Sequence, residues 1–171
     1  MKQLSVLLIV LSMIISVHNA NAAKPKAGVI TFDGYKQIKI GMKIKEVSKQ
    51  TGYKFINAAG FVEGDCAYVT SKSQPGLSFM LISGIIARID IAKGNFSTEA
   101  GAKTGDTEMT IKSKYPGRVK VERHEYDLKG HYIKVISANK KRSVVFETDG
   151  KKVTRWRVGR IPEVNYVEGC E

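Results

Sequence analysis

Apolar and polar residues alternate along much of this chain with the period of β-strands, and two pairs of such runs are joined by short turns. Leu77–Ile82 and Ile85–Ile91 flank a Ser-Gly dipeptide. Residues 144–147 and 153–158 flank Asp149-Gly150, which is a strong signal for a hairpin turn. The pattern therefore predicts two β-hairpins, one in each half of the chain.

Two short segments have helical periodicity instead. In the first, Ile44 and Val47 share one face and Gly52 ends the segment. In the second, Asp106 is the expected N-cap and Ile111 lies on the apolar face. Each predicted helix is a few turns long and precedes one of the hairpins.

Further strands are predicted at residues 29–32, Cys66–Thr70 and residues 131–137. Helices followed by runs of strands, without βαβ alternation, indicate an α+β fold with antiparallel sheets. The two halves have the same order of elements, so we expect a tandem of a first half at 23–95 and a second at 96–171. Chance similarity of two ordinary α+β segments is the alternative. The matched pairs are Gly41 with Gly105, Val47 with Ile111 and Tyr68 with Tyr132 at a spacing of 64, Gly84 with Gly150 at 66, and Arg88 with Arg155 at 67.

Alternation along the closing strands predicts which side chains face the core. Trp156 matches Ile89 in the comparison of the two halves, so it is expected inside. Arg88, Arg155 and Arg157 then point to the opposite face of the sheet, where we expect them to be outward.

The first 22 residues have the features of a signal peptide: a basic start, a short apolar run and the Ala20-Asn21-Ala22 cleavage pattern. The apolar run is shorter than the about 20 residues of a transmembrane helix. A retained N-terminal anchor is the alternative. No later run is long and apolar enough to span a membrane, so the mature protein is expected in the periplasm or outside the cell.

The chain has 28 Lys and Arg against 16 Asp and Glu, a formal net charge of +12. Such a balance points to nucleic acid in the cytosol, but an exported protein meets anionic lipid or polysaccharide instead. No nucleic acid partner is therefore expected. The lysines are spread along the chain, so a solvated coat that aids solubility is the alternative.

Cys66 and Cys170 are the two cysteines, and an even count in an exported chain favours a disulfide. Such a bond would tie the C-terminus to the middle of the chain. Two free thiols and a metal pair are the alternatives, although no Cys/His cluster has the spacing of a zinc site.

No catalytic pattern is present in the sequence. His124 and His131 are seven residues apart, whereas a zincin motif needs two histidines at i and i+4 on one helix. Glu122 and Glu125 could be read as a glycosidase pair, but ion pairing is the simpler interpretation. There is no Gly-x-Ser-x-Gly elbow and no phosphate-binding loop. We expect no enzyme, no metal and no cofactor.

One helix start resembles a known group. "IGMKIKEV" (residues 40–47) is similar to the helix start in the tandem units of β-lactamase-inhibitor proteins and of the SmpA/OmlA outer-membrane assembly domain. The second half departs from it, with Gly105-Asp106 replacing Gly-Met. The resemblance implies tandem α+β units, and it transfers no inhibitor contact residues.

Most of the mature chain resembles a family of uncharacterised exported bacterial proteins. The similar stretches are "EAGAKTGD", "YPGR", "GHY", "FETDG", "RVGR" and "YVEGC". This resemblance implies export and the disulfide, and it implies no activity.

A basic surface is the remaining candidate site. Its predicted members lie in the second hairpin region and on the closing strands: Arg88, Lys140, Lys141, Arg142, Lys151, Lys152, Arg155 and Arg157. The residues 140–142 and 151–152 flank the second hairpin, and we expect them to form one basic tip. Arginine forks suit phosphate and carboxylate, whereas lysines at a sheet edge can simply discourage edge pairing. The sequence thus favours an exported binding or inhibitor-like protein, with an envelope protein that binds anionic lipid or polysaccharide as the alternative.

Overall fold

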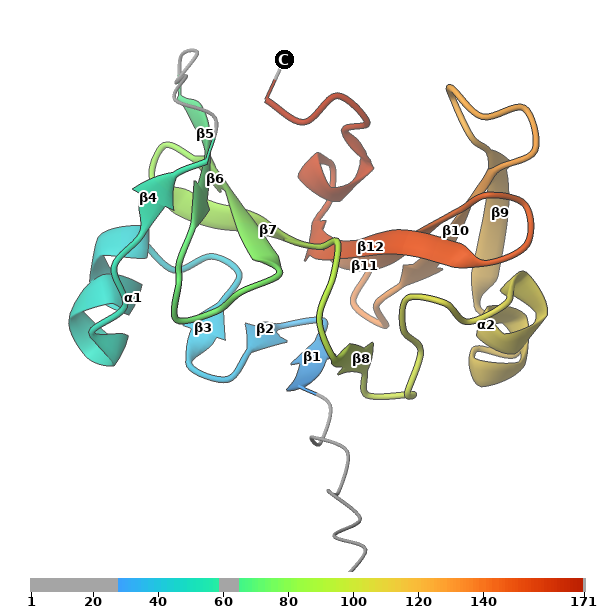
Figure 1. Ribbon diagram of the computed structural model, residues 1–171, viewed down its shortest axis with the longest axis horizontal. Coiled ribbons are helices and arrows are strands. Elements are labelled where there is room, and N and C mark those ends of the chain that lie inside the picture. Colours follow the sequence, from blue (N-terminus) through green and yellow to red (C-terminus); the bar gives the residue numbers. More distant parts are fainter. Residues whose placement is uncertain (1–27, 59–64, 171) are drawn as a thin grey trace, which may run out of the picture.

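The computed structural model describes residues 28–58 and 65–170, and it has a mixed α+β fold (Figure 1). The predicted signal peptide, residues 1–22, lies outside the described residues. The helices are α1 (Ile44–Thr51) and α2 (Glu108–Lys114), with the 3-10 turn η1 (Glu163–Asn165). The strands are β1 (Gly28–Thr31), β2 (Gly34–Tyr35), β3 (Ile38–Lys39), β4 (Ile56–Asn57), β5 (Cys66–Thr70), β6 (Leu77–Ile82), β7 (Ile85–Ile91), β8 (Phe96–Thr98), β9 (Val119–Arg123), β10 (His131–Ile136), β11 (Arg142–Thr148) and β12 (Val153–Arg160).

An eight-stranded antiparallel sheet forms the body of the molecule, in the order β4-β5-β6-β7-β12-β11-β10-β9. Strands from the first part of the chain make one side of the sheet and strands from the second part make the other. The two sides meet where β7 pairs with β12, with Asp90 opposite Arg157 and Ile91 opposite Trp156. Both predicted hairpins are confirmed, and β6 and β7 have the predicted bounds.

A smaller sheet, in the order β3-β2-β1-β8, lies on the same side of the large sheet as the two helices (Figure 1). Its β1–β8 pair is parallel, with Gly28 opposite Phe96 and Ile30 opposite Thr98. The strand predicted at residues 29–32 is therefore present, one residue earlier, as β1.

The main core lies between the large sheet and this layer of helices and short strands. Phe79, Phe146 and Trp156 are completely or nearly completely buried in it, and Val47 of α1 and Ile111 of α2 close it from below. Trp156 is in the core as its position in the alternating pattern predicts. Burial of such large apolar side chains is the main source of stability in a domain of this size.

The helix ends follow local rules, with one correction to the sequence interpretation. Gly52 ends α1 in the left-handed conformation, at φ 70°. The N-cap of α2 is Thr107, whose Oγ1 accepts from the backbone N–H of Thr110 at 3.1 Å, and the prediction of Asp106 is wrong by one residue. The Asp106 carboxylate instead accepts from Lys114 Nζ at 2.8 Å, which joins the two ends of the helix.

The opposite face of the large sheet carries the C-terminal segment, residues 161–170 (Figure 1). A second apolar cluster attaches this segment to the sheet. It consists of Tyr132 and Val145 from the sheet and Val164 of η1, with Val167 packed against them. The C-terminal segment therefore covers part of the sheet face that the alternating sequence pattern predicts to be polar.

Candidate functional site

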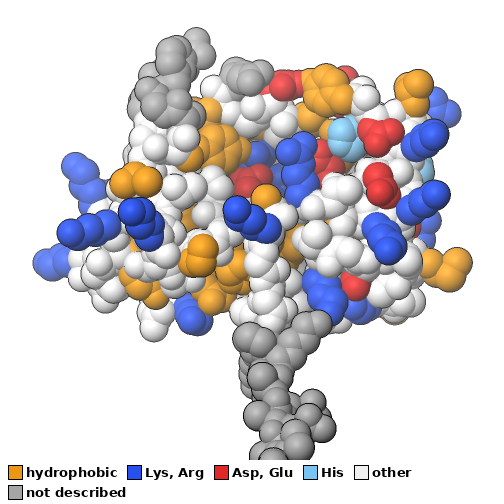
Figure 2. Space-filling model, in the orientation of Figure 1, with side chains coloured by type: hydrophobic (Ala, Val, Ile, Leu, Met, Phe, Trp, Pro, Cys, Tyr) orange, Lys and Arg blue, Asp and Glu red, His pale blue; other side chains and the backbone are white. Residues whose placement is uncertain are grey.

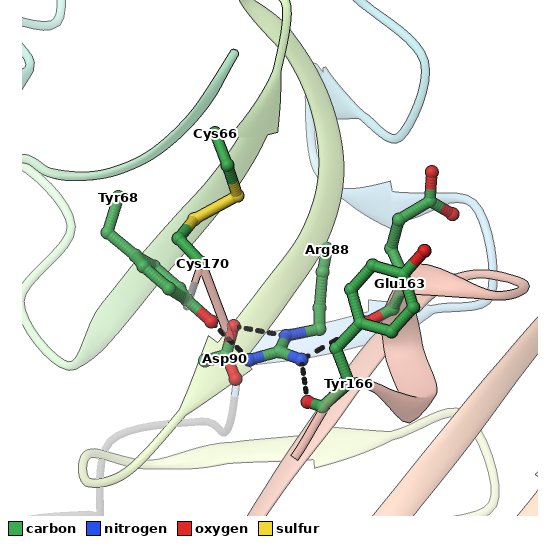
Figure 3. Close-up of a disulfide and its surroundings, with 7 residues drawn as sticks. All are labelled: Cys66, Tyr68, Arg88, Asp90, Glu163, Tyr166 and Cys170. Atoms are coloured by element: carbon green, nitrogen blue, oxygen red, sulfur yellow. Dashed lines mark hydrogen bonds and ion pairs between the residues drawn. A yellow bond between two sulfur atoms is a disulfide. The ribbon is translucent and has the colours of Figure 1, made fainter. Parts of the chain in front are cut away.

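The Cys66–Cys170 disulfide is formed, as the sequence predicts, and it fixes the end of the C-terminal segment to β5 (Figure 3). The two cysteines are 104 residues apart in the chain and their Cα atoms are 5.4 Å apart. The bond therefore joins the middle of the chain to its end, across the face of the sheet that carries the segment.

Arg88 lies beneath the C-terminal segment and binds it from the sheet. Its Nη1 donates to the backbone carbonyls of Glu163, at 3.1 Å, and Tyr166, at 2.7 Å. Its Nε donates to the Asp90 carboxylate at 2.9 Å, and its Nη2 donates to the Tyr68 hydroxyl (Figure 3). All three guanidinium nitrogens thus have partners within the chain, so Arg88 joins β5, β7 and the segment.

Arg157 makes the same kind of link on β12. Its Nε donates to the backbone carbonyl of Val164 at 2.8 Å and its Nη1 to the Glu147 carboxylate at 2.9 Å. Glu147 is only 2% exposed and also accepts two bonds from Arg155, at 2.7 and 2.8 Å. A buried carboxylate is stable only with such partners, so Glu147 and the two arginines form one unit.

His124 completes the coordination of Glu147. Its Nε2 lies 2.9 Å from Glu147 Oε1, and its Nδ1 accepts from the backbone N–H groups of Tyr126 and Asp127, each at 3.1 Å. The two backbone donors require an unprotonated Nδ1, so the proton sits on Nε2 and is donated to Glu147. The ring also stacks on Tyr132, with centroids 4.5 Å apart. Both ring nitrogens are therefore engaged in holding the β9–β10 loop.

A cleft of about 270 Å³ opens between these side chains and the end of the C-terminal segment. Figure 2 shows basic and acidic side chains next to one another in a hollow on this surface. The charged and phenolic residues that line the cleft are Tyr68, Arg88, Asp90, Glu147, Arg155, Arg157 and Glu168. Each arginine already faces a carboxylate or a carbonyl, so the cleft suits a group with both donors and acceptors better than a bare anion.

Burial and charge set the protonation states in the cleft. Burial raises the pKa of Tyr68 to about 12, with the Asp90 charge acting in the same direction, so the phenol is neutral at physiological pH. Burial likewise raises the pKa of Asp90. For Glu147 burial acts upward as well, but hydrogen bonding by Arg155 and the charges of Arg157 and Arg155 hold its pKa below the usual value. Glu147 is therefore the fixed negative charge of the site.

A second, more open hollow lies beside the cleft and is lined by aromatic, apolar and acidic residues. Tyr126 of the β9–β10 loop and Tyr166 and Val167 of the C-terminal segment line it, together with Glu125 and Glu168. Tyr126 is 67% exposed and Tyr166 is 42% exposed, so the hollow presents two aromatic side chains to solvent.

The predicted basic surface is divided by the structure. Arg88 and Arg157 are on the predicted face but are buried under the C-terminal segment, so the expectation that they point outward is wrong. The alternating pattern assigns each arginine to the correct face of the sheet, but it does not show that another segment of the chain covers that face. Arg155 alone of the three arginines has an exposed side chain, at 62%.

The other basic residues do not form one tip. Lys140 and Lys141 lie in the β10–β11 turn and are followed by Arg142, whose guanidinium pairs with Asp33. Lys151 and Lys152 lie in the β11–β12 turn. The two turns are at opposite ends of β11, a strand of seven residues, and strands rise about 3.3 Å per residue. The expectation of a single basic tip is therefore wrong.

Sequence reasoning missed the central residue of the site, Glu147, which it assigned only to a strand. It also missed the C-terminal segment as a structural element. The available signal was the pair of apolar residues Val164 and Val167 shortly before Cys170, because a disulfide to the middle of the chain must draw them onto the sheet.

Residues 28–58 and 65–170 contain no group of three His, Cys, Asp or Glu side chains arranged to hold a metal ion. Within the same ranges, neither helix has the length and apolar character that crossing a membrane requires.

Comparison with solved structures gives a distant likeness. The crystal structure of the uncharacterized protein YfeY from Escherichia coli matches with 14% sequence identity and a TM-score of 0.43, over 77% of this chain and 98% of that chain. No protein-family model matches the chain, and no curated protein matches it. The chain is thus distantly similar to an uncharacterised bacterial protein, and a likeness of this degree defines neither a family nor an activity.

Proposed function

We propose that this is an exported, non-enzymatic binding protein, inhibitor-like in character, that docks a macromolecular partner on the sheet face bearing the C-terminal segment. The observation that carries the proposal is the pair Tyr126 and Tyr166, two exposed aromatic side chains that line one hollow beside a charged cleft. Tyrosines in such positions commonly supply most of the binding energy of an interface.

The rigidity of this surface supports the proposal. Tyr166 belongs to a segment held by the disulfide, by Arg88 and by Arg157. Tyr126 belongs to a loop held by His124. A surface that is already ordered loses little conformational entropy when a partner binds, so more of the contact energy is available for affinity.

The adjacent cleft adds a means of discrimination. It presents the exposed Arg155 and the carboxylate of Asp90 close together, within a region that is partly removed from solvent. Opposite charges in fixed positions favour a partner with the complementary arrangement and penalise others.

The contact between a histidine and a buried carboxylate is the strongest feature in favour of an enzyme, but its geometry does not suit catalysis. His124 contacts Glu147, but its Nδ1 accepts from two backbone N–H groups and its Nε2 donates to that buried carboxylate. A general base needs a free nitrogen within reach of a substrate proton. His131 similarly bonds Glu108 at 2.8 Å, which links β10 to α2.

Export is part of the proposal. A disulfide across 104 residues is compatible with an oxidising compartment, where such bonds persist. The apolar N-terminal run with its Ala-x-Ala pattern supports cleavage after Ala22.

A tandem origin of the two halves is also proposed. The spacing of 67 that relates Arg88 to Arg155 also relates Asp90 to Arg157. Asp90 and Arg157 are direct register partners at the β7–β12 junction. If the two halves are copies of one unit that join through β7 and β12, a local two-fold axis must pass between these two residues.

Electrostatic attachment to anionic lipid or polysaccharide is the second candidate function. The exposed turns with Lys140, Lys141, Lys151 and Lys152 and the net charge of +12 favour it. Attraction between exposed charges is screened strongly at high salt, whereas an interface built on contacts of tyrosine side chains is not.

Retention of envelope and culture-fluid components on immobilised mature protein tests both candidates. We expect one defined component to be retained by the wild type in high salt and by a Met109→Ala control, which alters an exposed side chain of α2. The Tyr126→Ala/Tyr166→Ala variant should lose it. Equal retention by the double variant would contradict the proposal that the two tyrosines bind the partner. Loss of all retention in high salt would favour electrostatic attachment.

A further inference from the structure

The two edges of the large sheet differ in length. One edge is β4, which has two residues, and the other is β9, which has five. β9 pairs with β10 on one side and has no strand partner on the other among residues 28–58 and 65–170. Figure 1 shows β9 at the outer margin of the sheet. A five-residue open edge is long enough to pair with another strand.

The hydrogen-bonding groups that β9 presents outward follow from its register. The N–H of His124 donates to the carbonyl of Gly130 at 3.1 Å, so this pair is hydrogen-bonded. Antiparallel strands alternate between hydrogen-bonded and non-bonded pairs. The backbone groups of Val119, Val121 and Arg123 therefore point away from β10, toward the open edge.

The side chains of β9 have a self-complementary order. Val121 lies on the helix side of the sheet, opposite Ile133, and is 41% exposed. Lys120 and Glu122, which flank it, lie on the face of the C-terminal segment. One residue is therefore apolar and exposed, and its two neighbours carry opposite charges.

We propose that two copies of this chain pair through β9, antiparallel, about a two-fold axis at Val121. In this register Val121 of one copy is opposite Val121 of the other, and each Lys120 is opposite a Glu122. The outward backbone groups of Val119 and Arg123 then meet each other across the pair. The two eight-stranded sheets become one continuous sheet.

The charged side chains favour this register over the two alternatives in which the axis passes through an adjacent residue. A shift that centres the axis on Lys120 places two lysines directly opposite, and a shift to Glu122 places two glutamates opposite. Like charges in directly opposite positions destabilise a strand pair, and opposite charges stabilise it. Lysines on an edge generally prevent pairing, but here a second copy supplies the matching carboxylate.

The ion pairs within one copy are compatible with a dimer in which Lys120 pairs with Glu122 of the other copy. Glu122 is bound by Lys134 at 2.6 Å and by Lys120 at 3.0 Å. The Lys120 side chain is 71% exposed, so it is free to turn from its own Glu122 to that of the second copy. Lys134 of β10 binds the other carboxylate oxygen, Oε2, so Oε1, which Lys120 now binds, is the oxygen offered to the lysine of the second copy.

Sedimentation of the purified mature protein over a range of concentrations tests the proposal without any other partner. A single strand pair buries less area than a standard interface, so the dimer should be weak and depend on concentration. Lys120→Glu and Glu122→Lys each place like charges opposite in the homodimer. Each should raise the dimer dissociation constant about tenfold or more.

Mixing the two variants distinguishes strand pairing from a general loss of folding. One strand then carries two glutamates and the other two lysines, so both cross-strand contacts become attractive and a heterodimer should form. A wild type that stays monomeric at every concentration would overturn the proposal. Variants that dimerise like the wild type, or a mixture that stays monomeric while both variants are folded, would also overturn it.

Discussion

The Arg88 guanidinium donates a hydrogen bond of 2.7 Å to the backbone carbonyl of Tyr166, a residue 78 positions later in the chain. This bond joins a central strand of the sheet to a residue proposed to contact a partner. The C-terminal segment is therefore part of the folded unit, and the surface it offers depends on the buried arginines beneath it.

Removal of Arg88 should strongly destabilise the fold. Arg88→Met leaves the Asp90 carboxylate and two carbonyls without their donor, and breaking such a buried network costs on the order of 3–5 kcal/mol. Arg155→Met is the matched control, because Arg155 occupies the corresponding position in the other half and is mostly exposed. We expect a smaller loss than for Arg88→Met, because Glu147 keeps its hydrogen bonds with His124 and Arg157 when Arg155 is removed.

Urea denaturation of the two variants provides the comparison of unfolding free energies. Equal losses in Arg88→Met and Arg155→Met would show that the segment is not held from the sheet in the way described.

Loss of the disulfide should lower the unfolding free energy by about 4–5 kcal/mol, because a loop of about 100 residues is then unconstrained in the unfolded state. The Cys66→Ser/Cys170→Ser variant and reductant treatment of the wild type should give the same loss in chemical denaturation. Mass measurement with and without reductant checks that the bond is present. An unchanged unfolding free energy in the double variant would contradict this prediction.

Glu147 makes stability depend on pH in the acid range. Its pKa in the folded state is lower than the ordinary value of 4.5, because the arginine contacts outweigh burial. A carboxyl with a depressed folded pKa contributes stability that is present above the unfolded pKa and is lost as pH falls through the folded value. The contribution of Glu147 should therefore disappear progressively below about pH 4.5.

Glu147→Gln isolates this effect. The difference in unfolding free energy between wild type and variant should be constant near neutral pH and should shrink below pH 4.5. Asp90 acts with the opposite sign, because burial raises its pKa, but it is present in both proteins and cancels in the difference. A difference that stays constant well below pH 4.5 would contradict the assignment of Glu147 as the fixed charge.

The lysine turns separate the two candidate functions. Lys140→Gln/Lys141→Gln and Lys151→Gln/Lys152→Gln alter exposed residues and should change the unfolding free energy by about 0.5 kcal/mol or less. Under the leading proposal both variants keep binding to the partner in high salt. Loss of binding in these variants, with binding unaffected by Tyr126→Ala, would favour electrostatic attachment.

Much of the fold could be predicted from local patterns. The β6–β7 hairpin has the predicted bounds because its two strands are rich in apolar residues and flank a Ser-Gly turn, and Gly52 ends α1 as expected. β9 was missed because three of its five residues are charged and it has no apolar run. The strands β2, β3 and β4 have two residues each, which is too short for a periodic signal.

The site was less predictable, because its defining contacts join distant parts of the chain. Alternation placed Arg88 and Arg157 on the right face, but their burial depends on a segment that begins after β12. Glu147 gains its role only through Arg155, Arg157 and His124, which come together when β9–β12 pair. No local pattern contains such information.

Photo-crosslinking from the proposed surface tests the central claim most directly. Tyr166 is replaced by a benzoylphenylalanine residue, with the same replacement at the exposed Met109 of α2 as the control, and cells that export the protein are irradiated. The account predicts a discrete cross-linked product from position 166, formed also in high salt, and none from position 109. The absence of a product at position 166, or the same product from both positions, would contradict it.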